Sequence, residues 1–305
     1  MRKTLRMQSR AKSGVSTCFT AAILIAALPF SPFELAGKPA YRIFKNDGSA
    51  ASYDDMITAL AKSDIVFFGE LHGNPVIHWL QYETAADLFA ASRGMMDLGA
   101  EMLETDQQMI IDEYLSGAIS EGAFLRDARL WPHHRRDYQR LLDLAREKHA
   151  RFIATNAPRR YSALVFSKGI DALRGLGPGA LKYITPLPFE IPPREAAPDP
   201  AELGDEWSSI HRRGNWLEAQ ALKDATMAHF IAKNRRDGAL FLHFNGSGHS
   251  DFSRGIPRYL SLKNDRLKIA TVSSVIQDDV RELAEKHRGR AHFILCVPSA
   301  MVPGE

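Results

Sequence analysis

Residues 64–83, DIVFFGELHGNPVIHWLQYE, place one carboxylate and two imidazoles directly after a run of apolar side chains. A carboxylate beside an imidazole can work as a general base with its orienting partner, and both groups can ligate a divalent metal. Glu70 and His72 stand where a buried strand would end, and open α/β sheets bind their ligands at that end of their strands. The stretch therefore predicts a functional site. His78 falls on the following helix, where packing is the alternative to a functional role.

Three further apolar runs also end in polar or ionisable side chains, which the chain would deliver to the same edge of a parallel sheet. These side chains are Glu101, Glu104, Asn156, Arg159, Arg160, Tyr161, Asn245, Ser247 and His249. We expect four residues to share one site, and we call them the quartet: Glu70, His72, Glu101 and His249.

The quartet allows two kinds of chemistry. Two carboxylates and two imidazoles without a thiolate suit zinc, manganese or iron, and the same groups suit acid–base hydrolysis. The sequence contains no H-E-x-x-H helix, phosphate-binding glycine loop or Gly-x-Ser-x-Gly turn, so Ser247 is a weak candidate for a nucleophile. Metal ligation, acid–base catalysis and a set of solvated loop residues that bind nothing specific stay open at this point.

The elements that must position these groups are short apolar runs separated by amphipathic stretches. The predicted strands are 65–69, 95–102, 151–156, 239–246, 268–275 and 292–297, and their nearly continuous apolarity is typical of strands covered on both faces. The predicted helices are 75–92, 137–148 and 216–233, the first with Asn74 as a cap and proline at its first position. The alternation predicts an α/β fold with a mainly parallel β-sheet flanked by helices.

One region interrupts the alternation. Residues 159–213 contain no convincing strand, and residues 184–200 form a proline-rich connector. We interpret residues 159–233 as a smaller inserted helical subdomain or lid. The α/β domain then comprises residues 38–158 and 234–305.

The amino terminus has the layout of a secretory signal peptide. Five basic residues in the first dozen positions precede an apolar run at 18–30 that is short for a transmembrane helix, and small residues follow near Ala36. We expect residues 1–37 to be a signal peptide and the protein to be exported to the periplasm or envelope, with an uncleaved anchor as the alternative. Cys18 opens the apolar run, whereas a lipidated cysteine follows it, so a lipid anchor is disfavoured.

The remaining composition is that of an ordinary globular protein. The net charge is +3, and the five basic residues of the amino-terminal tail exceed that total. The rest of the chain is therefore near neutral or slightly acidic and shows no basic patch typical of nucleic-acid binding. Cys296 lies within an apolar run and is predicted to be a small core residue rather than half of a disulfide.

Several stretches, in their order along the chain, resemble the ChaN-like haem-binding lipoproteins. They are FFGELHGNPVIHWLQ, GAEMLETDQQMIIDEYLSG, LWPHHRRDYQRLL, IATNAPRRYSALV, AQALKDATMAHFI and FNGSGHSDFSRGIPRYL. The resemblance spans residues 41–302. The wider superfamily also holds erythromycin esterases, TraB-type proteins and Tiki-type metalloproteases.

This resemblance implies a large parallel sheet with a smaller helical domain and a role in haem and iron uptake at the envelope. It implies that a tyrosine holds the haem iron, and tyrosinate suits ferric haem because a hard anionic oxygen stabilises the oxidised metal. It further implies a homodimer over stacked haems, with a His and a Lys of the partner on the propionates. An outer-membrane haem receptor is a further expected partner.

Carried over to this chain, the resemblance makes Tyr138 the first candidate for the iron ligand and Tyr161 the second. The candidates for propionate binding are His133, His134, Lys168 and Lys223. Many relatives carry an aromatic residue, often tyrosine, at the position of His134, so this chain departs from the family pattern there. The rival hypothesis is a metal-dependent or acid–base hydrolase that uses the quartet.

Overall fold

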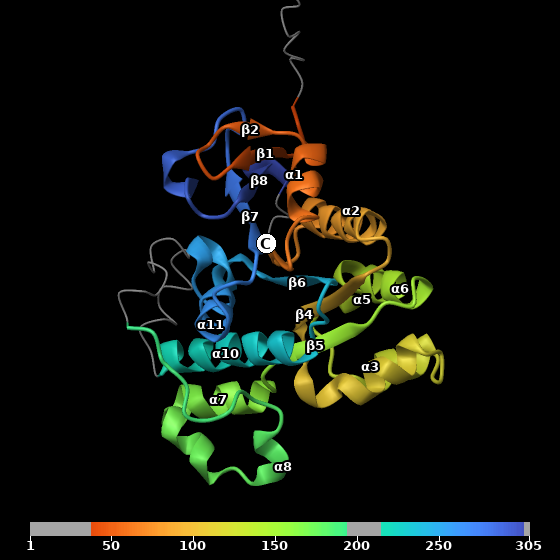
Figure 1. Cartoon of the computed structure of the whole chain (residues 1–305), viewed down its shortest axis with the longest axis vertical. Helices are drawn as coiled ribbons and strands as arrows, with labels where there is room; N and C mark the ends of the chain where they lie inside the picture. Colours follow the sequence, from red (N-terminus) through yellow and green to blue (C-terminus); the bar gives the residue numbers. More distant parts are fainter. Residues whose placement is uncertain (1–37, 194–214, 302–305) are drawn as a thin grey trace, which may run out of the picture. The chain divides into compact units, whose positions relative to one another are not determined.

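A sheet of eight strands organises the computed structural model, which describes residues 38–193 and 215–301. The predicted signal peptide at 1–37 and part of the predicted lid, residues 194–214, lie outside the described residues. The strand order is β2-β1-β8-β7-β3-β6-β4-β5, and every pair from β8 to β5 is parallel. The predicted α/β class is thus confirmed (Figure 1).

All six predicted strands are present. They are β3 (Ile65–Glu70), β4 (Met96–Glu104), β5 (Phe152–Asn156), β6 (Leu240–Gly246), β7 (Ile269–Gln277) and β8 (Phe293–Pro298). The sequence patterns did not predict β1 (Arg42–Lys45) and β2 (Ala50–Ala51), an antiparallel hairpin that adds to β8. Both strands are too short to show a period of two.

The helices fill the connections between strands. They are α1 (Tyr53–Leu60), α2 (Pro75–Ala91), α3 (Gln108–Leu115), α4 (Glu121–Asp127), α5 (His134–Asp137), α6 (Gln139–Glu147), α7 (Arg159–Lys168), α8 (Pro178–Leu181), α10 (Trp216–Asn234) and α11 (Ile256–Lys263). Asn74 caps α2 as predicted, since its side chain accepts hydrogen bonds from the backbone N–H groups of Val76 and Ile77. The helix predicted at 137–148 is α6, which begins at Gln139 because the backbone at Tyr138 leaves the helical region (φ −123°) and separates it from α5.

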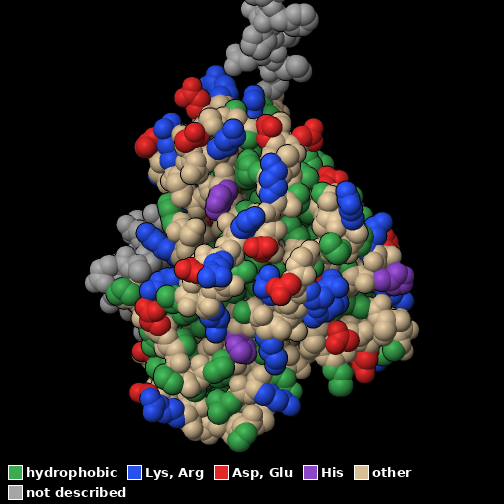
Figure 2. Space-filling view, viewed as in Figure 1, with side chains coloured by type: hydrophobic (Ala, Val, Ile, Leu, Met, Phe, Trp, Pro, Cys, Tyr) green, Lys and Arg blue, Asp and Glu red, His purple; other side chains and the backbone are tan. Residues whose placement is uncertain are grey.

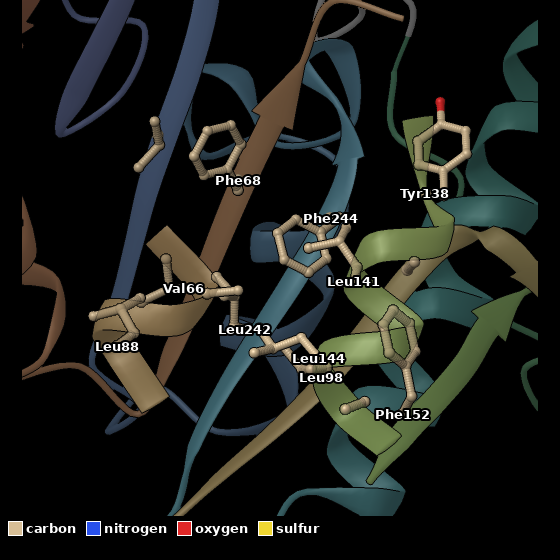
Figure 3. Packing of buried hydrophobic residues seen from close by; sticks show 14 of the residues in the cluster. Val66, Phe68, Leu88, Leu98, Tyr138, Leu141, Leu144, Phe152, Leu242 and Phe244 are labelled. Atoms are coloured by element: carbon tan, nitrogen blue, oxygen red, sulfur yellow. The ribbon is translucent and has the colours of Figure 1, made fainter. Parts of the chain in front are cut away.

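Alternate residues of the central strands pack into two separate hydrophobic clusters, one on each face of the sheet. Val66 and Phe68 of β3 face α2 and α6, together with Leu242 and Phe244 of β6 (Figure 3). Their neighbours Ile65 and Phe67 face the other layer, which is formed by α10 and α11. This double coverage explains why the strands are almost continuously apolar.

The segment from α7 to α10 contributes a smaller cluster of its own. Tyr161 and Val165 of α7 pack there against Leu222 in α10, while Ile231, later in the same helix, packs against the sheet. The described residues from Pro39 onward form one compact unit, and the predicted boundaries at 159 and 233 stay a prediction.

The part of the chain that the structure describes contains no helix long and apolar enough to cross a membrane. Acidic and basic side chains are interspersed over the face drawn in Figure 2. Cys296 is fully buried in β8, as predicted.

Candidate functional site

The carboxyl ends of three neighbouring strands bring the quartet together around Gly246. Glu70 at the end of β3 is in register with Gly246 at the end of β6, whose backbone N–H donates a hydrogen bond of 2.8 Å to Glu101 of β4. A Cβ atom on Gly246 would lie 2.9 Å from His72 Nε2 and 3.6 Å from Glu101 Oε2. His72 and Glu101 therefore approach each other across a residue that has no side chain.

Glu70 is a buried carboxylate that accepts three hydrogen bonds. The Tyr138 hydroxyl donates to its Oε1 at 2.8 Å, and His72 Nδ1 lies 2.7 Å from the same oxygen. The Gln81 side-chain amide donates to Oε2 at 2.5 Å. Three contacts on both oxygens hold this carboxylate in one orientation. Glu70 is only 2% exposed, so these hydrogen bonds replace the water that a carboxylate loses on burial.

His78 supports Glu70 indirectly. Its Nε2 accepts a hydrogen bond from the backbone N–H of Gly73, so Nδ1 carries the proton and donates to Gln81 Oε1 at 2.8 Å. Gln81 in turn donates to Glu70. His78 is buried, as the packing interpretation predicts. It also holds Gln81, and through Gln81 it orients the Glu70 carboxylate.

His72 is the most accessible member of the quartet, with a side chain that is 45% exposed. Burial opposes protonation of its ring, but the hydrogen bond to Glu70 and the charges of Glu101 and Glu70 outweigh it and raise the pKa of His72. The imidazole is thus both accessible and held in one orientation by Glu70.

His249 lies between two carboxylates. Its Nε2 is 3.1 Å from Glu101 Oε1, and its Nδ1 is 2.5 Å from Asp224 Oδ1 in the middle of α10. Burial opposes the charge, yet the two carboxylates raise the pKa of His249 to about 10. Glu101 is desolvated, but the His249 charge outweighs this and holds the Glu101 pKa well below its usual range. We call Glu101, His249 and Asp224 the charged trio.

Sequence reasoning missed Asp224 because it lies on a helix rather than at a strand end. Burial and the charge of Glu101 raise the pKa of Asp224 despite the opposing effect of His249. Gly255, with φ +56°, lets the backbone after His249 turn close to Asp224, since a Cβ there would lie 3.1 Å from Asp224 Oδ2.

The quartet's donor atoms are directed at one another rather than at a common point. Within residues 38–193 and 215–301, no group of three or more His, Cys, Asp or Glu side chains is arranged to hold a metal ion. The prediction of a metal at the quartet gains no support from this arrangement and stays a prediction.

The two candidate tyrosines have opposite environments. The Tyr138 ring lies at the edge of the main cluster, and its hydroxyl points away from that cluster (Figure 3). Burial and the charge of Glu70 raise the pKa of Tyr138 far above its ordinary value. Tyr161 is 8% exposed, and the Arg160 guanidinium lies over its ring at 4.5 Å and donates to its hydroxyl at 3.3 Å.

The structure does not bring the four propionate candidates into one group. His133 is exposed in a left-handed conformation, whereas His134 is buried with Nε2 3.2 Å from Gln139 Oε1, and burial lowers its pKa to about 4. A buried neutral imidazole does not suit binding of an anion. Lys168 is exposed at the end of α7, and Lys223 lies on α10, where its charge helps to lower the Glu101 pKa.

The chain matches a known protein family over most of its length. The family model described as haem-binding uptake, Tiki superfamily, ChaN matches residues 56–260. The chain therefore belongs to this family of haem-binding uptake proteins.

A solved structure of a ChaN protein shares the fold of this chain. The structure described as cofacial haem binding to ChaN of Campylobacter jejuni has a TM-score of 0.63 at 18% identity, covering 85% of this chain and 97% of that one. The type III effector HopBA1 has a TM-score of 0.47 at 14% identity, covering 80% of this chain and 92% of that one. A Bacillus cereus protein has a TM-score of 0.49 at 10% identity, covering 85% of this chain and 95% of that one. The last two likenesses are too weak to carry an argument. No curated protein matches the chain.

Proposed function

We propose that this protein is exported and binds haem as cargo during haem and iron uptake at the cell envelope. The observation that carries the proposal is the family match over residues 56–260. The cofacial haem binding described for ChaN of Campylobacter jejuni supports a homodimer as the working assembly.

Within this proposal the geometry favours Tyr161 over Tyr138 as the iron ligand. Ligation needs the phenolate, and Tyr138 would have to form a second negative charge 2.8 Å from the buried Glu70 carboxylate. The Tyr161 oxygen instead accepts a hydrogen bond of 3.3 Å from the Arg160 guanidinium, a cation. This reverses the order that the sequence suggested.

The test is a haemin titration of the chain from Lys38 onward, followed by visible absorption. We expect a saturable high-spin ferric spectrum with a charge-transfer band in the wild type and in Tyr138→Phe, and the loss of that band in Tyr161→Phe. Tyr138→Phe should instead lower the free energy of unfolding by about 2 kcal/mol, because a buried carboxylate loses a charge-assisted hydrogen bond.

Two results would count against the proposal. A featureless titration of the wild type would overturn haem binding. Loss of the band in Tyr138→Phe, with Tyr161→Phe unchanged, would keep haem binding and move the ligand to Tyr138. Tyr259→Phe is a matched control, since its buried hydroxyl donates at 2.6 Å to the Glu190 backbone carbonyl.

A second candidate function is acid–base hydrolysis at the quartet. The observation that favours it is the exposed His72 imidazole, held by Glu70 and adjacent to Glu101 across Gly246. If the quartet is catalytic, the wild type should cleave p-nitrophenyl acetate, and His72→Ala should lose roughly 100-fold or more of that rate, as expected for loss of a general base.

A glycine pair provides the matched control for this experiment. Gly246→Ala would push His72 from its place and should lose most of the rate, whereas Gly248→Ala, with no atom within 4 Å of the new methyl group, should keep it. Equal rates in all four proteins would exclude the quartet as the source of hydrolysis.

A further inference from the structure

Three arginines gather on two carboxylates beside Tyr161. We call this group the arginine cluster: Arg129, Arg159, Arg160, Glu104 and Asp106. Arg129 reaches both carboxylates, Arg159 Nε pairs with Glu104, and Arg160 Nη1 lies 2.6 Å from Asp106. The cluster joins the end of β4 with the start of α7 and the segment after α4.

Three arginines and two carboxylates give the cluster a net charge of +1, and the arginines are its accessible members. The two carboxylate side chains are 3% and 9% exposed, whereas those of Arg129, Arg159 and Arg160 are 47%, 56% and 48% exposed. The acids therefore form the floor, and the guanidinium groups face outward with more N–H donors than two carboxylates can accept. Such an arrangement selects an anion of planar geometry, because a guanidinium pairs with a carboxylate through two parallel hydrogen bonds.

The position of Arg160 connects this surface to the candidate iron ligand. One nitrogen of its guanidinium pairs with Asp106 and the other donates to the Tyr161 hydroxyl at 3.3 Å. Arg129 shares Asp106 with Arg160, and Arg159 shares Glu104 with Arg129, so a continuous series of contacts connects the Tyr161 hydroxyl with all three arginines.

We propose that the arginine cluster binds a propionate carboxylate of haem whose iron is held by Tyr161. This assignment rests on the proposed haem-binding function and gives it a second contact within the same subunit. It replaces His134 and Lys168 in that role, because the first is buried and neutral and the second lies at the opposite end of α7 from the cluster.

The experiment compares haemin with haemin dimethyl ester, in which both propionates are uncharged. Arg129→Gln and Arg159→Gln each leave Glu104 paired with the remaining arginine, so both variants should fold. We expect each to weaken haemin binding about 10-fold, the effect of losing one charge-assisted hydrogen bond, and to leave binding of the ester within about twofold of wild type. Lys168→Gln removes the same charge from the same surface helix as Arg159→Gln and should change neither affinity.

Other outcomes overturn the assignment in distinguishable ways. Equal weakening of haemin and its ester would show that the arginines support the fold rather than the propionates. Unchanged haemin affinity in both arginine variants, or weakening only in Lys168→Gln, would place the propionates elsewhere while haem binding stands. A wild type that binds neither porphyrin would overturn the proposed function and this assignment together.

Discussion

Glu101→Gln is expected to lower the free energy of unfolding by about 3 to 5 kcal/mol, the cost of removing one partner from a buried charge pair. Glutamine keeps one oxygen for the Gly246 N–H but turns its NH2 group toward His249 Nε2, so the loss would reflect both the missing charge and the missing acceptor at His249. His249 would be left in a buried position with Asp224 as its remaining carboxylate. Urea denaturation at pH 7, followed by circular dichroism, measures the difference.

Glu121→Gln is the control for this measurement. Glu121 forms an ion pair of 3.0 Å with Arg135, but its side chain is 44% exposed, so its loss should cost less than about 1 kcal/mol. If Glu101→Gln were no more destabilising than Glu121→Gln, the trio would not hold a charged imidazole.

The charged trio also makes stability depend on pH, with a sign that follows from the two pKa shifts. The pKa of His249 is raised from 6.5 to about 10, so its contribution is complete below pH 6.5 and is lost as pH rises toward 10. The pKa of Glu101 is depressed, so its contribution is present above its ordinary value of 4.5 and is lost only as pH falls through the depressed value. Wild-type stability should therefore decline between pH 7 and pH 10, and this decline should be smaller in Glu101→Gln.

The central sheet could be predicted from the sequence because burial on both faces leaves a direct mark on composition. Runs such as IVFFG are apolar at every position, and Val66 and Phe67 do pack on opposite faces. The β1–β2 hairpin leaves no such mark, since β2 has two residues and β1 buries only two of its four. The short α5 was not predicted for a related reason, because its four residues, HRRD, include no apolar side chain that could show a helical period.

The site could be predicted only where it depends on strand ends. Glu70 and Glu101 converge because parallel strands deliver their carboxyl ends to one edge, a rule that needs no distances. Asp224 and Gln81 reach the same site from helices, and helical spacing does not distinguish a side chain that faces a buried histidine from one that faces solvent. The grouping of the arginine cluster depends on tertiary contacts between residues 23 or more positions apart.

A second large loss in the free energy of unfolding is expected for changes at the contact between Gly99 of β4 and Phe241 of β6. A Cβ atom on Gly99 would lie 2.8 Å and 2.9 Å from two ring carbons of Phe241, which is fully buried against α10 and α11. Phe241→Ala should lower the free energy of unfolding by about 3 to 5 kcal/mol through the cavity that it leaves. Gly99→Ala alone should cost about 1 to 3 kcal/mol, because the ring has no space in which to move.

The losses of stability in the two variants should not add, because removing the Phe241 ring also removes the atoms with which the Gly99→Ala methyl group would clash. In the Phe241→Ala protein the Gly99→Ala methyl group would meet the vacated space, so adding it should cost little or restore some stability, with a coupling energy of about 1 to 3 kcal/mol. Urea denaturation of the wild type, both single variants and the double variant closes the cycle, and Gly248→Ala, whose methyl group meets no atom within 4 Å, controls for the backbone effect of alanine. Additive losses would mean that the Phe241 ring does not occupy the space that the missing Gly99 side chain provides. The same two strands hold the Glu101 hydrogen bond, since β4 carries Glu101 and β6 ends at Gly246, whose N–H donates to it.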